Sequence, residues 1–184
     1  IFAGAIPIGG VSDKICKHIW ENAKSLPWYV VVGELDRGSV TQNSRDVGRM
    51  LAAGYDIIYA QYVGAGADGY YAEIHRLFDW MSRLRRVKYE KNQQIDYSVL
   101  RNSDTQIHWL TFTGLPQAVV QSDWSSEKGG RVNRLKMTAK VSEGNTALIG
   151  VGADGYTAWL SPDFVDFEKR LRVQVGSRSR WYDF

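Results

Sequence analysis

The sequence predicts an α/β fold in its first half and a smaller β-rich region in its second half. The apolar run at residues 28–32, without polar alternation, is typical of a parallel strand that helices cover on both faces, and residues 56–62 predict a second buried strand. Each run is followed by a segment in which apolar residues recur at helical spacing. Beyond Lys88, short β-type runs alternate with turn residues, which indicates a small antiparallel sheet or sandwich.

The chain is expected to form two domains joined by a connector. Residues 1–88 carry the α/β pattern, and residues 107–184 carry the β-rich pattern. Residues 89–106 are mostly polar and lack sustained periodicity, so we interpret them as a connector or as an excursion over the surface of the first domain. A chain of 184 residues with 44% hydrophobic residues is long enough and apolar enough to form real cores.

Charge and cysteine content argue against several classes of function. The net charge is +3, from 23 basic and 20 acidic residues, and this near balance gives no electrostatic case for a nucleic acid partner. No run approaches the roughly 18 to 20 apolar residues of a membrane helix, so we expect no membrane span. With a single cysteine, Cys16, and no zinc or calcium spacing, we expect no metal and no cofactor, and no compartment is indicated.

The first domain begins with an expected strand and an expected helix. An apolar run from Ala3 to Ile8 is closed by two glycines and predicts a buried strand, although Pro7 argues against regular pairing along its whole length. Ser12 is a candidate N-terminal cap for a helix that ends before Pro27.

Two further helices are expected around the second apolar strand. Val47, Met50 and Leu51 are expected on one face of the first of them, and Gly54 marks its end. The turn from Gly64 to Gly69 then leads into a helix with an apolar stripe. The stripe consists of Tyr71, Ile74, Leu77, Phe78, Met81 and Leu84. In the β-rich region, strands are expected at residues 107–113, 134–141, 146–151, 156–160 and 171–175.

The strand expected from Ala3 to Ile8 has an outer edge that nothing earlier in the chain can cover. A parallel sheet is normally buried, and an uncovered apolar edge is an aggregation hazard. We therefore expect a partner there: a missing N-terminal segment of the same polypeptide, another chain, or the β-rich region folding back. The first residues have neither an initiator Met nor the basic flank of a signal peptide, so the chain is expected to begin at an internal cut.

Three stretches carry a resemblance to a known family. They read F-A-G-A-I-P-I-G-G from Phe2, L-P-W-Y-V-V-V-G-E-L-D from Leu26, and Y-V-G-A-G-A-D-G-Y-Y-A-E-I-H-R-L-F-D-W-M from Tyr62. In this order and spacing, over about residues 1–86, the chain resembles the end of a serine α/β-hydrolase of the dienelactone-hydrolase and prolyl-oligopeptidase-like type. The resemblance implies the last three strands and helices of an α/β-hydrolase parallel sheet, followed by a smaller β-rich region like the C-terminal extension of some bacterial members.

The resemblance assigns a role to Asp36 and reveals a departure at Ala67. In such enzymes the triad runs Ser, then Asp or Glu, then His along the chain. By position Asp36 in G-E-L-D matches the acid, which orients the imidazole and stabilises the imidazolium. Alternatively, Asp36 caps a loop or pairs with an arginine. The family's G-x-G-H pattern implies histidine at position 67, where this chain has alanine, and alanine cannot act as a general base.

The nucleophile is missing as well. No G-x-S-x-G elbow occurs in the sequence, and the family places it before the strand that begins at Ala3. We therefore expect this chain to be part of a serine esterase or peptidase, supplying the acid turn for acyl transfer to water and inactive alone. His18, His75 and His108 do not suit a replacement base. Three explanations of Ala67 stay open: loss of the base in evolution, deliberate alteration, or an incorrect residue assignment.

A second hypothesis is a non-catalytic binding or scaffold protein that keeps the hydrolase framework. It would contact a protein or a glycan through the aromatic β-rich region. Four tryptophans fall in or near that region, although most such residues serve as core: Trp109, Trp124, Trp159 and Trp181. The tail from Arg178 to Phe184 is basic and aromatic, which suits either docking to another surface or a frayed terminus.

Overall fold

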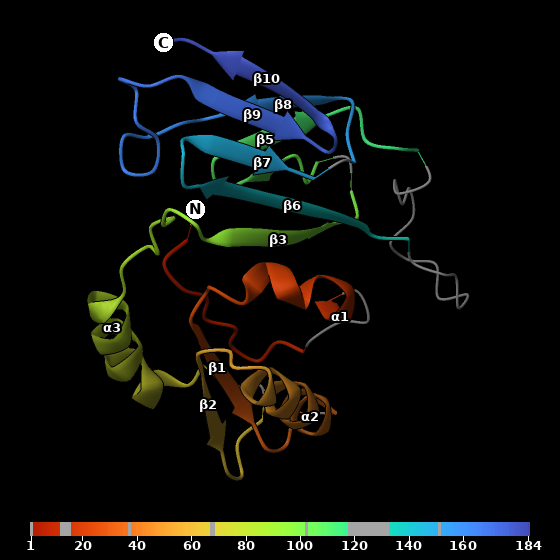
Figure 1. Ribbon diagram of the computed structural model, residues 1–184. Helices are drawn as coiled ribbons and strands as arrows, with labels where there is room; N and C mark the ends of the chain where they lie inside the picture. Colours follow the sequence, from red (N-terminus) through yellow and green to blue (C-terminus); the bar gives the residue numbers. More distant parts are fainter. Residues whose placement is uncertain are drawn as a thin grey trace. The chain divides into compact units, whose positions relative to one another are not determined.

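The computed structural model describes residues 2–11, 16–36, 38–66, 69–101, 103–117, 133–150 and 152–184 (Figure 1). The chain divides into two compact units, unit 1 at Ile1–Val87 and unit 2 at Lys88–Phe184. Each unit has its own hydrophobic core, and each is described by itself.

Unit 1 is built on two parallel strands, β1 (Trp28–Gly33) and β2 (Ile57–Tyr62), which pair along their whole length. The side chains of Val31 and Val32 in β1 are fully buried. Complete burial agrees with the uninterrupted apolar run from which the strand was predicted, because both faces of such a strand are covered.

A third segment borders β1 without forming a regular strand. Ala5 bridges to Trp28, and Ile8 bridges to Val31, both in the parallel sense. Pro7 has no amide hydrogen, so only its carbonyl oxygen takes part, accepting a hydrogen bond from Val31 N at 2.9 Å. The strand that the sequence predicts in this segment is therefore present only as isolated bridges.

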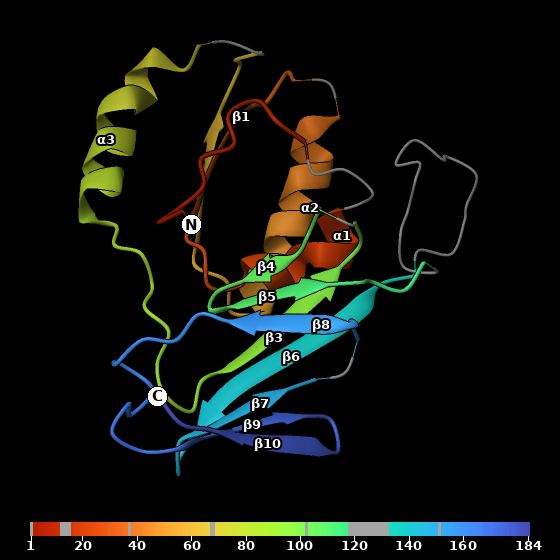
Figure 2. The ribbon, with the colours of Figure 1, turned by 90° about the horizontal axis from the view of Figure 1, so that it is seen from above.

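The helices of unit 1 lie on both faces of the β1–β2 pair. Figures 1 and 2 show α2 on one side and α3 on the other. Gly54 takes a φ of +78°, a conformation open to glycine, and it ends α2 as predicted. The helical segments are α1 (Cys16–Ile19), the 3-10 turn η1 (Trp20–Ala23), α2 (Ser39–Ala52), the 3-10 turn η2 (Tyr71–Glu73) and α3 (Ile74–Arg83).

The apolar stripe predicted on α3 is divided between core and surface. Leu77 is buried in a cluster with Tyr29 of β1, and Trp80 packs against the same cluster. In contrast, Phe78 is 63% exposed and Met81 is 41% exposed. Only one edge of the stripe therefore packs on the sheet within the described part of unit 1.

Unit 2 contains two sheets. The larger has the strand order β10-β9-β7-β6-β3, and the smaller has the order β4-β5-β8. Neighbouring strands pair antiparallel, except that β7 and β9 are parallel. The strands are β3 (Gln94–Val99), β4 (Gln106–Ile107), β5 (Leu110–Thr113), β6 (Leu135–Ser142), β7 (Thr146–Ile149), β8 (Gly155–Ala158), β9 (Leu171–Val175) and β10 (Arg178–Tyr182).

One core cluster joins the two sheets of unit 2. Met137, Ala139 and Val141 are the buried alternate residues of β6, and Phe112 of β5 contributes a fully buried ring from the other sheet. Alternation of buried and more exposed residues along β6 is the pattern of a strand with one face on a core. The β-rich character predicted for the second half of the chain is confirmed.

The predicted fold class, the last three strands and helices of an α/β-hydrolase parallel sheet with a smaller β-rich region, is wrong. In the described part of the chain, the parallel sheet has two strands, whereas the other sheets have five and three. Among those residues, only α2 and α3 are helices longer than four residues. The parallel sheet stays at two strands because the segment around Pro7 does not complete a ladder. The described helices and strands are mostly β, since the second half holds more strands than expected.

The connector predicted over residues 89–106 is also corrected. It contains β3, which pairs with β6 over its whole length. Ile95 and Val99 of β3 are buried in the core of unit 2, so this segment is part of the sheet. The tail from Arg178 forms β10, an ordered strand paired with β9.

Candidate functional site

The turns that follow β1 and β2 lie side by side at the carboxyl ends of the strands. Leu35 N donates a hydrogen bond to Ala65 O at 2.8 Å. Gly33 permits this approach, since a Cβ atom there would lie 2.2 Å from the carbonyl oxygen of Gly66. The topology therefore brings together the two turns in which the sequence predicts the acid and the missing base.

Asp36, the predicted triad acid, lies half-buried on the turn after β1, and its amide donates to Gly33 O at 3.2 Å. Ala67 lies outside the described residues, so its place relative to Asp36 stays a prediction. A second carboxylate ties the turns together: Glu34 Oε2 accepts a hydrogen bond from Gly64 N at 2.8 Å.

The histidines lie on other elements of the chain. His75 is exposed on α3, and His18 belongs to α1. His108 lies in the turn between β4 and β5 of unit 2, with a φ of +47°. None of the three therefore belongs to the turns after β1 and β2.

A buried carboxylate that the sequence did not reveal lies between α3 and the sheet of unit 1. Glu73 is 1% exposed and accepts hydrogen bonds from the hydroxyls of Tyr29 and Tyr62. Arg76 Nη1 is 3.7 Å from Glu73 Oε2. The cluster uses both carboxylate oxygens, and it links the start of α3 to both strands.

The environment of Glu73 shifts the pKa of each member of this cluster. Burial by itself raises the pKa of Glu73, but the two hydroxyl hydrogen bonds and the Arg76 charge outweigh it, so the pKa is lowered. Burial, helped by the hydrogen bond to Glu73, raises the pKa of Tyr29 to about 12. The same carboxylate raises the pKa of Tyr62, mainly through its hydrogen bond. These directions indicate an ionised carboxylate held by neutral phenols.

The tryptophans of unit 2 differ in their exposure to solvent. Trp109 is 4% exposed and packs in the core, so it cannot contact a partner. Trp159 is 63% exposed, and its Nε1 donates to Thr111 Oγ1 at 2.9 Å. Trp181 on β10 is 54% exposed. Trp124 lies outside the described residues.

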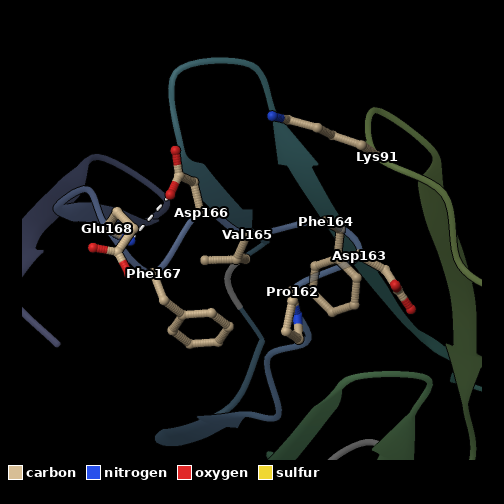
Figure 3. A pocket seen from close by; sticks show the side chains of 8 residues that line it. All are labelled: Lys91, Pro162, Asp163, Phe164, Val165, Asp166, Phe167 and Glu168. Atoms are coloured by element: carbon tan, nitrogen blue, oxygen red, sulfur yellow. Dashed lines mark hydrogen bonds between the residues drawn. The ribbon is translucent and has the colours of Figure 1, made fainter.

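A pocket of about 470 Å³ lies on the loop between β8 and β9. Figure 3 shows the rings of Phe164 and Phe167 in this pocket, with Lys91 extending from the segment before β3 in the direction of Asp166. The lining residues are Lys91, Pro162, Asp163, Phe164, Val165, Asp166, Phe167 and Glu168. The predictions from sequence do not include this site, although the repeat D-F-V-D-F between two predicted strands is a visible signal.

Asn145 holds the pocket loop in place. Its Nδ2 donates to the carbonyl oxygens of Asp166 at 2.9 Å, Lys169 at 3.1 Å and Arg170 at 3.1 Å. Its Oδ1 accepts from the amide of Asp166 at 2.9 Å. Asn145 is 6% exposed and takes a φ of +55°, a left-handed conformation that asparagine tolerates better than most residues. A buried side chain therefore fixes the loop backbone at three positions.

Some charged groups of the pocket have hydrogen-bond or ion-pair partners within the protein, and others have none among the described residues. Asp166 Oδ2 lies 2.8 Å from Lys169 Nζ, and this hydrogen bond, with one from the Glu168 amide, lowers the pKa of Asp166. The partnership raises the pKa of Lys169. Within the described residues, no hydrogen bond or ion pair engages the side-chain carboxylates of Asp163 and Glu168. These two groups remain available to a ligand.

An aromatic surface adjoins the pocket. The ring of Phe167 contacts Phe184 edge-on, with 4.6 Å between centroids. Arg170 pairs with Asp183 at 2.8 Å, and its guanidinium lies 5.9 Å from the ring centroid of Trp181. These contacts tie the end of the chain to the loop, so exposed rings continue from the pocket along β10.

Comparison with known proteins identifies no relative of this chain. No protein family, no curated protein and no solved structure matches it. In the part of the chain that the structure describes, no helix is long and apolar enough to cross a membrane. Nor do the described residues contain a group of three or more His, Cys, Asp or Glu side chains that could hold a metal ion.

Proposed function

We propose that unit 2 binds an oligosaccharide in the pocket between β8 and β9. The observation that carries this proposal is the combination of phenylalanine rings, unused carboxylates and an ammonium group on a loop held by Asn145. The pocket has a volume of about 470 Å³ and is open to solvent. This is the glycan form of the binding hypothesis, with the pocket loop in place of tryptophans as its main contact.

The two phenylalanines have separate roles in this proposal. Phe164 is 7% exposed and packs edge-on against Tyr89 at 5.1 Å between centroids, so it forms a fixed floor. Phe167 is 38% exposed and offers ring surface to the apolar C–H face of a sugar. An amphipathic ligand is favoured, because the apolar rings and the charged groups line the same hollow.

The charged groups supply hydrogen bonds of both kinds. Ionised carboxylates such as Asp163 and Glu168 are acceptors only, so they suit the hydroxyl donors of a sugar. Lys91 has only donors, which suit hydroxyl and ring oxygens. Hydrogen bonds to ionised groups are about twice as strong as neutral ones, so a few of them can fix the orientation of a polar ligand.

A fixed loop favours binding, because ordering a flexible loop around a ligand costs free energy. The four Asn145 hydrogen bonds order the loop before any ligand arrives. The open pocket and the adjoining ring of Phe184 give room for a chain of sugars rather than a single ring. We therefore propose an oligosaccharide as the ligand class.

The test is a screen of the full chain on an oligosaccharide array, followed by calorimetric titration with the best binder. Phe167→Ala and Asp163→Asn are each expected to weaken binding at least tenfold, which corresponds to about 1.4 kcal/mol. Phe78→Ala is the matched control, because Phe78 is an exposed phenylalanine of unit 1, and it should change nothing. An array without binders, or a binder indifferent to Phe167→Ala, overturns the proposal.

The serine hydrolase function implied by the resemblance stays a prediction, and the specific observation in its favour is the hydrogen bond of 2.8 Å between the turns after β1 and β2. The serine and the base would come from a segment or chain that pairs along residues 5–8. A fluorophosphonate probe applied to the chain with its co-purified partners tests this. Serine labelling that slows with Asp36→Asn supports acyl transfer, and labelling that ignores this substitution contradicts it.

A further inference from the structure

β10 forms one margin of the five-stranded sheet of unit 2 (Figure 1). It pairs with β9 without a bulge, from Arg178 opposite Val175 to Tyr182 opposite Leu171. All five residues of the strand are exposed. Among the described residues, no strand pairs with its other side, so β10 presents an open edge.

The pairing determines which backbone groups point outward from this edge. Arg178 and Val175 close a two-residue hairpin loop, so they form a hydrogen-bonded pair. Because hydrogen-bonded and non-hydrogen-bonded pairs alternate, Ser179 and Trp181 direct their amides and carbonyls away from β9. A hydrogen bond of β9 agrees with this alternation. Arg172 lies opposite Trp181, and its amide points away from β10 and donates to Asn145 O, just before β7, at 3.0 Å.

The side chains next to this edge carry positive charge without internal partners. Arg178 and Arg180 lie on the same face of β10, since alternate residues of a strand share a face. No hydrogen bond or ion pair engages either guanidinium within the described residues. The acid that follows the strand, Asp183, is paired with Arg170 at 2.8 Å.

We propose that β10 binds an extended acidic peptide that adds to the sheet as a further strand. The outward backbone groups of Ser179 and Trp181 pair with the main chain of the peptide. Acidic side chains at alternate positions of the peptide meet Arg178 and Arg180, whose guanidinium groups pair with carboxylates bidentately. An apolar side chain between them lies against Trp181. This proposal does not depend on the oligosaccharide pocket.

Charge selects this occupant over a second copy of β10. Two β10 strands side by side would bring the unpaired guanidinium groups of both copies together, and like charges across neighbouring strands are destabilising. Basic side chains on edge strands generally discourage association with other sheets. A strand with alternating carboxylates reverses the sign of that interaction, so the edge is selective for acidic sequences.

The experiment uses the full chain and a fluorescent blocked heptapeptide, Thr-Glu-Val-Glu-Val-Glu-Thr, in anisotropy titrations. Saturable binding with a Kd below about 1 mM is expected, and the peptide with Lys in place of Glu should not bind in that range. Two N-methylated peptides test pairing through the backbone: one is methylated at the Val amides and the other at the Glu amides, which point to opposite sides of an extended peptide. The peptide whose methyl groups point away from β10 should bind like the parent, and the peptide whose methyl groups face β10 should bind at least tenfold more weakly.

Variants of β10 separate backbone pairing from charge. Ser179→Pro removes an outward amide while leaving the bonds to β9 intact, and it should weaken binding at least tenfold. Ser179→Ala keeps that amide and should bind within threefold of the parent chain. The pair Arg178→Glu and Arg180→Glu should abolish binding, whereas Arg86→Glu with Lys88→Glu, the same change of charge at exposed residues two apart, should not.

Each outcome decides for or against the proposal. Equal weakening by the two N-methylated peptides, or tight binding to Ser179→Pro, would show association by charge alone and overturn strand addition. Binding of the Lys peptide as tightly as the Glu peptide would overturn the acidic specificity. Thermal unfolding of each variant within a few degrees of the parent ensures that a loss of binding is not a loss of fold.

Discussion

The carboxylates of the two units differ in how completely the protein uses their oxygens. In unit 1, Glu73 is 1% exposed and both of its oxygens accept hydroxyl hydrogen bonds. In unit 2, Asp163 and Glu168 line an open pocket, and no side-chain hydrogen bond or ion pair engages them within the described residues. A carboxylate whose oxygens accept hydrogen bonds inside the protein stabilises the fold. A carboxylate on a fixed loop whose oxygens accept no internal hydrogen bond can bind a ligand instead.

The largest effect is expected from removing the buried carboxylate. Glu73→Ala leaves the buried hydroxyl of Tyr29 and the partly buried hydroxyl of Tyr62 without their acceptor, and an unsatisfied buried group costs about 1 to 3 kcal/mol. We expect a loss of about 3 kcal/mol in the stability of unit 1, measured by urea unfolding with hydrogen exchange at β1. Glu168→Ala, the same truncation in the pocket, should cost less than about 0.5 kcal/mol. Similar losses of stability in Glu73→Ala and Glu168→Ala would contradict the difference between the two carboxylates.

A smaller effect is expected where the pocket loop is held. Asn145→Gly keeps the positive φ but removes four side-chain hydrogen bonds, and about 2 kcal/mol of local stability should be lost. Hydrogen exchange at residues 161–170 should accelerate, and oligosaccharide affinity should fall although the lining residues are intact. Unchanged exchange in Asn145→Gly would contradict the role of this side chain.

The smallest effect is a difference in pH response between the units. The folded pKa of Tyr29 is raised from 10.0 to about 12, so its contribution is present below pH 10 and is lost as pH rises through about 12. The pKa of Glu73 is lowered, so its contribution is lost as pH falls through its folded value. Exchange at β1 should therefore accelerate in alkali before exchange at β6 does, and Tyr29→Phe should abolish that difference. Equal alkaline acceleration of β1 in Tyr29→Phe would refute the assignment.

Local patterns in the sequence predicted some elements well. The uninterrupted apolar run of β1 and the short run of β9 appear as strands close to their predicted bounds. Two other strands carry polar residues at alternate positions, and because of these residues the strands were not predicted. In β3, Ile95 and Val99 alternate with polar neighbours, and in β10 Arg178 and Arg180 gave the appearance of a tail.

The fold class and the sites depend on contacts between distant residues. The turns after β1 and β2, to which the resemblance assigns the acid and the missing base, meet through the hydrogen bond from Leu35 N to Ala65 O. The segment around Pro7 forms only isolated bridges, in line with the irregular pairing that Pro7 predicts. Glu73 resembles a surface residue in sequence, because its partner Tyr29 lies 44 residues away. Residues 162–168 form most of the pocket and are contiguous in sequence, but only the fold brings Lys91 to them.

The central claim is that the pocket between β8 and β9 binds an oligosaccharide. The most direct test is a titration of isotope-labelled full-length chain with the best array binder, followed by nuclear magnetic resonance of the backbone amides. Saturable shifts are expected at residues 161–170 and at Lys91, with β1 and α3 unaffected. Shifts confined to other residues, or none at saturating ligand, would contradict it.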